Sequence, residues 1–391
     1  MEIRFACIEF NTKSGSIWRP SPEKPNYLCD PKREIDIGSF GSWTSALNGE
    51  HIPLHWFVDG KPRRGVSDVP PFHNTLLYRV WSAFKKEILK NGRPLLKFKN
   101  LKYLEKFNVI LVCFHFVFSR ELTQFLKEAK ERYPEKVFLV TYGTFNFGRV
   151  REYWRDTDWY KDFMEFLNAG DIFILVNKSA RDYFRLVTEK PIVYFPTFYP
   201  TSYTKKYFLP REKKEKKIFI AGTTERMDIV WSCLLAKKLQ ERFPEFTLQA
   251  CNWKNMNLET LNGSRVEVLP WLRWEDYLKE TGKAFLILNT DTWWTNGRVP
   301  SDAAAVGTPC IGVNADRQMD LFPDLIVSEV VDTRKALQLG SRLIEDENFY
   351  TEILRKALQN LAHHSYERAN DRLGKLLDLY QQGKLEISDV L

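Results

Sequence analysis

Several features that define large classes of protein are missing from this sequence of 391 residues. No stretch reaches the roughly 18–20 consecutive apolar residues that would span a bilayer. The six cysteines are scattered, and no two have the close spacing of a zinc knuckle or a redox motif. The N-terminal residues have a strand-like pattern, so we expect no signal peptide. These absences predict a soluble, cytoplasmic protein with reduced thiols.

The sequence also lacks most short motifs that identify enzyme classes. It contains no Walker A loop, no complete G-x-G-x-x-G after a strand, no H-E-x-x-H and no G-x-S-x-G. Asp156 and Asp158 have an acid-x-acid spacing that can hold a divalent ion, but they follow a polar, tryptophan-rich stretch rather than a strand. We interpret them as surface acids, and we expect no bound metal and no resident cofactor.

Charge and aromatic content narrow the range of partners. Lysine and arginine number 58 against 50 aspartates and glutamates, which gives a net charge of +8 and a pI near 9.0. This charge suits anionic ligands such as a nucleotide, a nucleic acid or an anionic membrane surface, without requiring a polyanion. Aromatic residues make up 14% of the chain, and their rings either stack on sugars and bases or fill an aromatic-rich core.

Short apolar runs alternate with helical stretches along the chain. Most of these runs lack polar alternation, which is typical of parallel strands covered on both faces. The strand candidates are residues 3–10, 52–58, 109–115, 136–142, 171–177, 192–196, 218–222, 246–251, 266–269, 284–289, 310–313 and 325–327. Helices are predicted between them, among them 119–132, 227–243 and 275–281. The pattern predicts an α/β protein with two doubly wound, Rossmann-like domains facing a central cleft.

A domain boundary is expected near residues 197–217. This stretch begins with turn-like residues and ends in a charged run, 211–217, which we interpret as solvated. Asp332 is the expected N-cap of the helical region near the C-terminus, and the proline-rich residues 11–38 are expected to form a long loop. The predicted division is a first domain at 1–205, a second domain at 206–375 and a helical tail at 376–391 that can cross back to the first domain.

The most informative segment for chemistry runs from residue 284 to residue 310. It has the pattern of a buried strand, a polar and aromatic loop, a short helix with Pro300 in its first turn, and Gly307 just past the helix end. The free amides and dipole of the helix start, beside Arg298, would attract a phosphate. Because α/β sheets bind ligands at the carboxyl ends of their strands, we predict an anion site here. A plain strand–helix crossover with a surface arginine is the alternative.

A second candidate anion site follows the strand at 218–222. Gly222 permits close backbone approach, the hydroxyls of Thr223 and Thr224 can donate hydrogen bonds, and Arg226 is a second cation at a helix start. A capped helix with a solvated Arg226 is the alternative. Two such sites in one domain favour a diphosphate over a single phosphate.

At these residues the sequence resembles nucleotide-sugar glycosyltransferases of the GT-B architecture, in particular the retaining group that includes glycogen and sucrose synthases. Residues 301–310 are similar to the family's acidic residue, small residues, Gly-Thr-Pro and strand. Residues 269–278 resemble the turn and helix before its donor loop, and 49–54 resemble its Gly-His before the second strand. The family's paired glutamates are replaced, since Asp302 stands at the second position and the first falls near Trp294.

The resemblance implies a metal-independent enzyme that moves a sugar from a nucleoside-diphosphate sugar, with a UDP-sugar expected, to an acceptor hydroxyl. The acceptor would lie against the first domain and is a saccharide, a lipid-linked saccharide or a modified DNA base. Catalytic roles are expected for His115, Arg226, Arg298 and Asp302. Donor contacts are expected from Gly222, Thr223, Thr224, Trp271, Leu272, Asn296, Gly297, Val299, Pro300 and Ser301. Acceptor-side contacts are expected from Gly38, Ser39, Gly41 and Tyr142, with Gly38 and Gly41 preceding a helix start.

The implied mechanism assigns a role to each main group. Arg226 and Arg298 would offset the charge that builds on the departing diphosphate. Asp302 would hold ribose or sugar hydroxyls, Trp271 would stack on the base, and His115 would contact the sugar or act as a base.

Three other functions remain open from the sequence. The same fold could glycosylate modified bases in DNA, since the basic balance and the aromatic residues allow contacts to phosphates and bases. The replaced family acids also allow a two-domain binding protein without catalysis. A sugar epimerase of similar fold would turn over a nucleotide sugar with no acceptor present.

Overall fold

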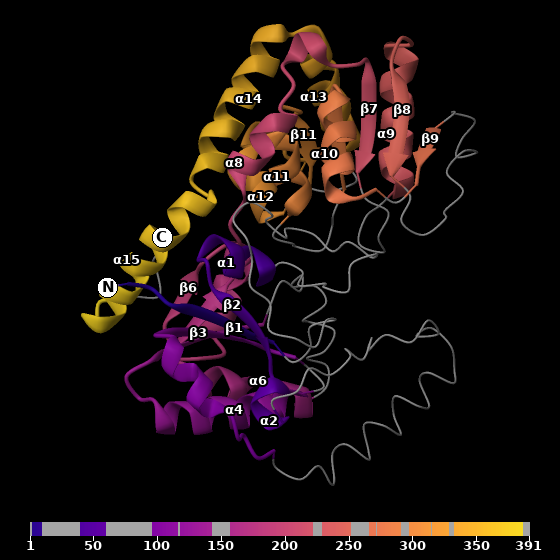
Figure 1. Ribbon diagram of the computed structural model, residues 1–391. Helices are drawn as coiled ribbons and strands as arrows, with labels where there is room; N and C mark the ends of the chain where they lie inside the picture. The colour runs from indigo at the N-terminus through magenta and orange to yellow at the C-terminus, as the bar shows by residue number, and fades with distance from the viewer. Residues whose placement is uncertain are drawn as a thin grey trace.

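The computed structural model consists of two lobes, each built on one parallel sheet (Figure 1). The structure describes residues 2–9, 40–59, 96–115, 118–142, 157–221, 229–251, 266–270, 272–290, 297–313, 315–327 and 332–385. The loop predicted at 11–38 lies outside these ranges.

The first sheet contains six parallel strands in the order β2-β1-β3-β4-β5-β6. The strands are β1 (Phe5–Glu9), β2 (Glu50–Pro53), β3 (Val109–Cys113), β4 (Val137–Thr141), β5 (Ile172–Leu175) and β6 (Ile192–Tyr194). The helices of this lobe are α1 (Phe40–Ala46), α2 (Trp56–Asp59), α4 (Ser119–Arg132), α6 (Thr157–Ala169) and α7 (Arg181–Arg185). Every residue of β3 and β4 is buried, which explains their uninterrupted apolar sequences.

The second sheet contains five parallel strands in the order β11-β10-β7-β8-β9. The strands are β7 (Lys217–Ala221), β8 (Thr247–Cys251), β9 (Val266–Leu269), β10 (Leu286–Asn289) and β11 (Cys310–Gly312). The helices that follow the first lobe are α8 (Thr201–Thr204), α9 (Ile229–Arg242), α10 (Trp274–Lys283), α11 (Arg298–Ala305), α12 (Asp316–Leu321), α13 (Thr333–Glu345), α14 (Glu347–Ala362) and α15 (Ala369–Gln381). In Figure 1 the arrowheads of β7 and β8 point toward the first lobe.

The predicted α/β class with two parallel sheets is confirmed, and two strand predictions need correction. The strand predicted at 52–58 ends at Pro53, and its second half contains α2. The strand predicted at 325–327 is wrong: Pro323–Leu325 is a 3-10 turn, and Ile326 makes a single bridge to Gly312. Pro323 fixes its backbone φ near the value that such a turn requires. The chain therefore turns beside the sheet and pairs with its edge at Ile326 alone among these residues. The predicted N-cap is confirmed, because the Asp332 carboxylate accepts a hydrogen bond from the backbone amide of Lys335.

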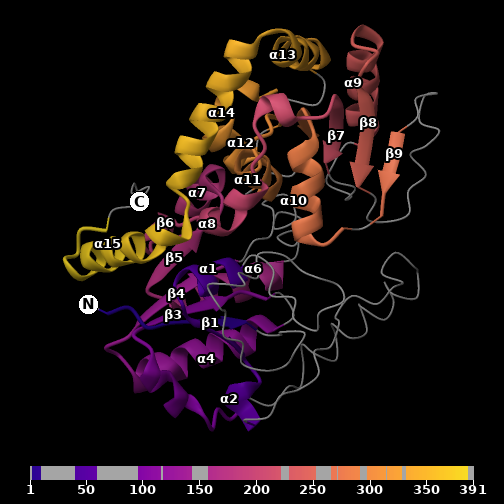
Figure 2. The ribbon, with the colours of Figure 1, turned by 45° about the horizontal axis from the view of Figure 1, so that its top comes forward.

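Each lobe has its own hydrophobic core, and the chain passes between the two cores twice. The first core includes buried residues from Phe5 to Phe198, and the second includes buried residues from Tyr199 to Leu361. The C-terminal helix α15 then returns to the first core, where Ala369, Leu373, Leu376 and Leu377 are buried. Figure 2 shows α14 descending along one side of the second lobe, and α15 continuing from its lower end beside the first lobe. The returning helix begins at Ala369, earlier than the tail set at 376 from the sequence.

The charged run at 211–217 is not wholly solvated, contrary to the prediction. Lys217 is buried, and the Lys214 ammonium donates hydrogen bonds to the carbonyl oxygens of Gly282 and Val306 at 2.7 and 3.0 Å. These carbonyls lie at the C-terminal ends of α10 and α11, where helices leave carbonyl groups without internal partners. Burial lowers the pKa of Lys214 to about 7.

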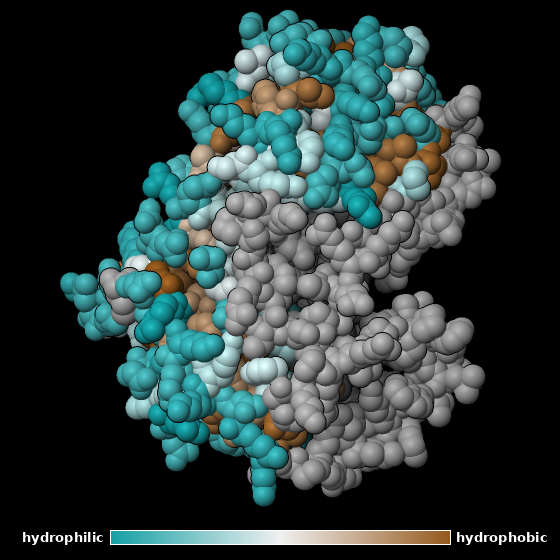
Figure 3. All heavy atoms as spheres, in the orientation of Figure 1, coloured by the Kyte–Doolittle hydropathy of each residue, from teal (hydrophilic) through white to brown (hydrophobic). Residues whose placement is uncertain are grey.

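The outer surface in view is mainly hydrophilic over the described residues (Figure 3). The large apolar side chains that are exposed, including Leu186, Leu234 and Leu358, come from different segments of the chain. None of the helices that the structure describes combines the length and apolar character needed to cross a membrane.

Candidate functional site

The start of α11 lies beyond the carboxyl end of β10, a strand inside the second sheet. Gly297 precedes the helix with a φ of 80°, in the left-handed region that glycine adopts without strain. A Cβ at this position would lie 3.1 Å from the Cβ of Ala315 and 3.3 Å from the Cβ of Arg317. Gly297 therefore permits both the turn into α11 and the close approach of α12.

The side chains at this helix start are only partly accessible. Arg298 and Val299 are half-buried, whereas Pro300 and Ser301 are buried. Gly307 ends the helix with a φ of 74°, as the sequence pattern indicated. The helix dipole and the Arg298 guanidinium together provide positive charge at the carboxyl edge of the second sheet.

Asp302 is buried, with 3% of its surface exposed, one turn along α11 from Arg298. Its Oδ1 accepts a hydrogen bond from the Tyr199 hydroxyl at 2.8 Å and another from the Trp274 indole nitrogen at 3.1 Å. Burial raises the pKa of this carboxyl to about 6, against the lowering effects of the two donors and of Arg298. One oxygen of Asp302 is thus occupied inside the protein, and its contact with ribose or sugar hydroxyls stays a prediction.

Two further polar side chains at this edge were not singled out from the sequence. Arg317 is 1% exposed, and its Nη2 donates to the carbonyl oxygen of Thr197 near the junction between the cores. Its Nη1 and the Oδ1 of Asn289, the last residue of β10, are buried without hydrogen-bond partners in the described part of the chain. In the sequence Arg317 is one of many arginines, and only the packing of α12 against Gly297 distinguishes it.

Much of the second predicted anion site lies outside the described residues. This applies to Gly222, Thr223, Thr224 and Arg226, and also to Trp271, Asn296, Gly38 and Ser39. The juxtaposition of Arg226 with Arg298 therefore stays a prediction. Leu272 is described and half-buried, two residues after Pro270, whose carbonyl oxygen accepts a hydrogen bond from the Cys251 thiol at the end of β8 at 3.5 Å.

On the first lobe, the predicted acceptor-side residues have different surroundings. His115 is half-buried after β3, with its ring 5.3 Å from that of Phe118. Tyr142 is fully buried and its hydroxyl donates to Oδ1 of Asn177 at 2.9 Å, so an acceptor contact for it stays a prediction. Gly41 lies inside the first turn of α1, which begins at Phe40, and the prediction that it precedes the helix is wrong.

A carboxylate at the edge of the first sheet was also missed. Glu9 is the last residue of β1, and its Oε2 lies 3.0 Å from Nε2 of His51 on the neighbouring strand β2. The Glu9 side chain is 23% exposed, whereas His51 is fully buried. An acidic residue that ends an apolar strand is the sequence signal that could have identified it.

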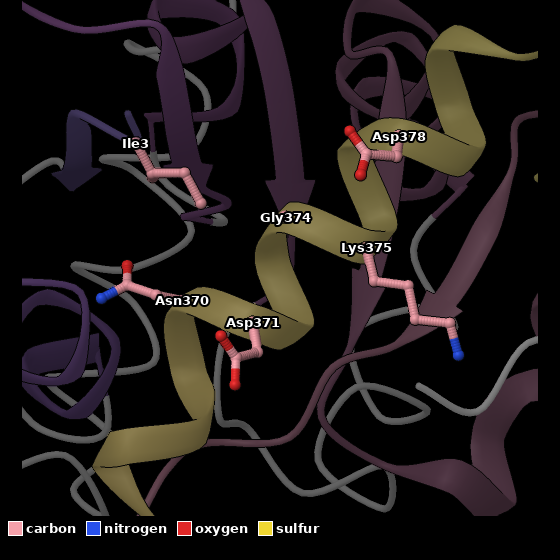
Figure 4. Close-up of a pocket in the computed structure, with 6 residues that line it drawn as sticks. All are labelled: Ile3, Asn370, Asp371, Gly374, Lys375 and Asp378. Atoms are coloured by element: carbon pink, nitrogen blue, oxygen red, sulfur yellow. The ribbon is translucent and has the colours of Figure 1, made fainter. Parts of the chain in front are cut away.

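Two depressions on the described surface lie elsewhere and contain no predicted site residue. The first, of 470 Å³, is lined by Ile3 and the α15 residues Asn370, Asp371, Gly374, Lys375 and Asp378. Its polar side chains do not converge on one point (Figure 4), and Ile3 precedes β1, at the amino edge of the sheet. The second, of 490 Å³, lies between α4 and α6. Among the described residues no group of three or more metal-ligating side chains is assembled.

Comparison with known proteins identifies the fold. No protein-family model and no curated protein sequence matches the chain. Solved structures do match it, including sucrose-phosphate synthase from Thermosynechococcus elongatus, with a TM-score of 0.60, 13% identity, and 97% of this chain and 100% of that chain covered. An α,α-trehalose 6-phosphate synthase from Burkholderia multivorans matches with a TM-score of 0.58, 10% identity and coverage of 97% and 99%.

A trehalose-6-phosphate structure from E. coli bound with UDP-2-fluoro glucose matches with a TM-score of 0.57, 11% identity and coverage of 96% and 99%. The chain spans less than two thirds of some other matches, such as 59% of a chain of the GtfA/B complex. The chain therefore has the GT-B fold of two parallel α/β lobes, as the sequence resemblance implied.

Proposed function

From this GT-B fold, we propose that the protein is a glycosyltransferase that moves a sugar from a nucleoside-diphosphate sugar, with a UDP-sugar preferred, to an acceptor hydroxyl. The proposal rests mainly on one observation: α11 begins beyond the carboxyl end of β10 and carries Arg298 at its first position. Ligands of α/β sheets bind at such edges, and helix starts favour phosphates. The UDP-containing E. coli structure of the same fold supports the choice of nucleotide.

In this mechanism the second lobe holds the donor. The amides of Val299 and Ser301, the dipole of α11 and the Arg298 guanidinium stabilise the negative charge that develops on the departing diphosphate. Arg226 supplies a second cation in the same scheme. Protein cations then supply the charge stabilisation that a divalent metal provides in other transferases, so the reaction proceeds without one.

The acceptor lies against the first lobe, at the edge where β1 ends. A partly exposed carboxylate such as Glu9 can accept the proton of an attacking hydroxyl, or orient that hydroxyl by a hydrogen bond. The buried His51 contacts Oε2 of Glu9, and the Glu9 side chain is partly exposed. We therefore add Glu9 to the acceptor-side candidates His115 and Tyr142.

A binding screen tests the donor proposal directly. Melting temperature is measured with UDP, GDP, ADP and TDP, because a ligand that binds only the folded state raises it by mass action. Arg298→Ala should weaken binding of the preferred diphosphate about tenfold or more, since it removes a charge-assisted contact. The control is Arg334→Ala, an exposed arginine of α13 in the same lobe, which should leave binding unchanged.

The results separate the proposal from its main alternatives. Retention of binding and transfer by Arg298→Ala at near wild-type levels would show that the donor-site assignment is wrong. Binding without turnover of any nucleotide sugar would favour the non-catalytic binding protein, and turnover without an acceptor would favour an epimerase.

A further inference from the structure

Tyr199 lies where the two crossings between the cores meet. Its backbone amide donates to the carbonyl oxygen of His364 at 2.7 Å, and the amide of Tyr366 donates to its carbonyl oxygen at 3.1 Å. Together with the parallel bridge between Tyr199 and Ser365, these bonds join the outgoing and the returning segments. Tyr199 is thus fixed at the junction by its backbone alone, independently of its side chain.

The side chain of Tyr199 reaches away from this junction to the donor-side helix. Its ring is buried, and its hydroxyl donates to Oδ1 of Asp302 at 2.8 Å, beside the Trp274 indole that donates to the same oxygen. Tyr203, four residues further along, stacks on Trp274 with ring centroids 5.8 Å apart and an interplanar angle of 14°. Tyr199 therefore links the junction to α11 through the Asp302 carboxylate, whose Oδ1 also accepts the hydrogen bond from Trp274 on α10.

Asp302 is four residues from Arg298, so the two side chains lie on the same face of α11. A displacement of Asp302 would carry the first turn of the helix, with Arg298 and the backbone amides of that turn, in the same direction. Among the described residues, the Asp302 carboxyl is affected by the hydrogen bonds from Tyr199 and Trp274 and by the charge of Arg298. Asp302 in turn acts on the buried hydroxyl of Tyr277 on α10, together with Cys251 and Cys310.

We propose that Tyr199 is a positioning residue for donor binding: through Asp302 it fixes the start of α11 relative to the interlobe junction. The inference rests on the proposed function, because it assumes that this helix start binds the diphosphate. Tyr199 would not itself contact the ligand. It would link the donor site to the junction between the two lobes.

The test compares Tyr199→Phe with Tyr350→Phe. Each variant removes one buried tyrosine hydroxyl that donates a hydrogen bond, but the hydroxyl of Tyr350 donates to the carbonyl oxygen of Phe285, on the segment before β10. The Kd of the diphosphate that wild type binds best among UDP, GDP, ADP and TDP is measured by calorimetry from pH 5 to pH 8. We expect Tyr199→Phe to bind about tenfold more weakly at pH 8, as for loss of a hydrogen bond to a charged group, and Tyr350→Phe to bind within about twofold of wild type.

The pH profile distinguishes positioning from a general loss of stability. The ratio of the Tyr199→Phe Kd to the wild-type Kd should fall toward one at pH 5, where Asp302 is neutral and its hydrogen bond from Tyr199 is weaker. The titration of the nucleotide itself cancels in this ratio. If Tyr199→Phe does not fold, Trp274→Phe removes the other donor to the same oxygen and should show the same pH-dependent loss.

Equal affinities of wild type and Tyr199→Phe at pH 8, or an equal loss in Tyr350→Phe, would overturn the positioning role while leaving the donor site intact. Failure of wild type to bind any of the four diphosphates would overturn the proposed function, and this inference with it.

Discussion

The carboxyl group of Asp302 should make the stability of the protein depend on pH between about pH 4 and pH 6. Burial raises its pKa from 3.8 to about 6 in the folded protein. In this range the folded state holds a proton that the unfolded state has lost, so the free energy of unfolding falls as pH rises through it and is level above the folded pKa. The difference between the two pKa values is worth about 3 kcal/mol in total, at about 1.4 kcal/mol for each pH unit.

Asp302→Asn removes this titration while keeping the size of the side chain and an oxygen that can accept from Tyr199 and Trp274. The free energy of unfolding of the variant minus that of wild type should therefore rise by about 2 kcal/mol between pH 4.5 and pH 7.5, the part of the total that falls in this window. All other titrating groups are common to both proteins and cancel in the difference.

The assay is chemical unfolding of both proteins at pH 4.5, 5.5, 6.5 and 7.5, followed by circular dichroism. Asp320→Asn is a suitable control, because the pKa of Asp320 is lowered in the folded state and its contribution has the opposite sign. A difference between wild type and Asp302→Asn that does not change with pH, or that falls as pH rises, would refute the argument that the buried carboxyl is proton-linked to folding.

Three further predictions concern other parts of the molecule. Gly307→Ala should lower the free energy of unfolding by about 2 kcal/mol or more, since φ is 74° and a Cβ would lie 2.8 Å from the carbonyl oxygen of Leu209. Gly374→Ala is the control, because the space around Gly374 is open and the substitution should not destabilise the protein. Equal unfolding curves for the two variants would contradict the prediction. Leu376→Ala should lower the free energy of unfolding by about 2–5 kcal/mol, because this side chain is buried in the first core. Leu358→Ala is the control and should cost much less, since Leu358 is partly exposed. A small effect of Leu376→Ala would argue against the docking of α15 on the first core. Glu9→Gln should lower the rate of diphosphate release from the sugar donor about 100-fold without changing the affinity for the diphosphate. The matched control is Glu50→Gln, since Glu50 lies on the neighbouring strand β2 and accepts a hydrogen bond from the Tyr103 hydroxyl. Unchanged turnover in Glu9→Gln would exclude a role for Glu9 in the reaction.

The elements of the fold were predictable where local sequence carries the information. Continuous apolar runs identified the strands, because a strand buried on both faces admits few polar residues. Gly307 and Asp332 identified helix boundaries, because a left-handed turn and an unpaired helix amide each favour particular residues. The prediction failed at 325–327, where an apolar run indistinguishable from a strand reaches the sheet at one residue.

Pairings between distant residues could not be predicted in the same way. The sequence assigned Asp302 to a ligand and Lys214 to solvent, whereas Asp302 accepts from Tyr199 across 103 positions and Lys214 donates to Val306 across 92. Likewise, no pattern in the chain distinguished Arg317 from other arginines, and the position of Glu9 at the end of an apolar strand did not show that His51 lies beside it. Their significance comes from which elements pack beside them.

The amino-acid sequence by itself determined the parallel α/β class, the two-lobed organisation and a helix start beside Arg298, because burial pattern and backbone preference act over a few neighbouring residues. Only the tertiary structure decided that α15 completes the first core and that Tyr199 and Asp302 connect the junction to α11. These depend on how sheets and helices pack over long separations, where burial and hydrogen-bond satisfaction are shared between segments that are far apart in the chain.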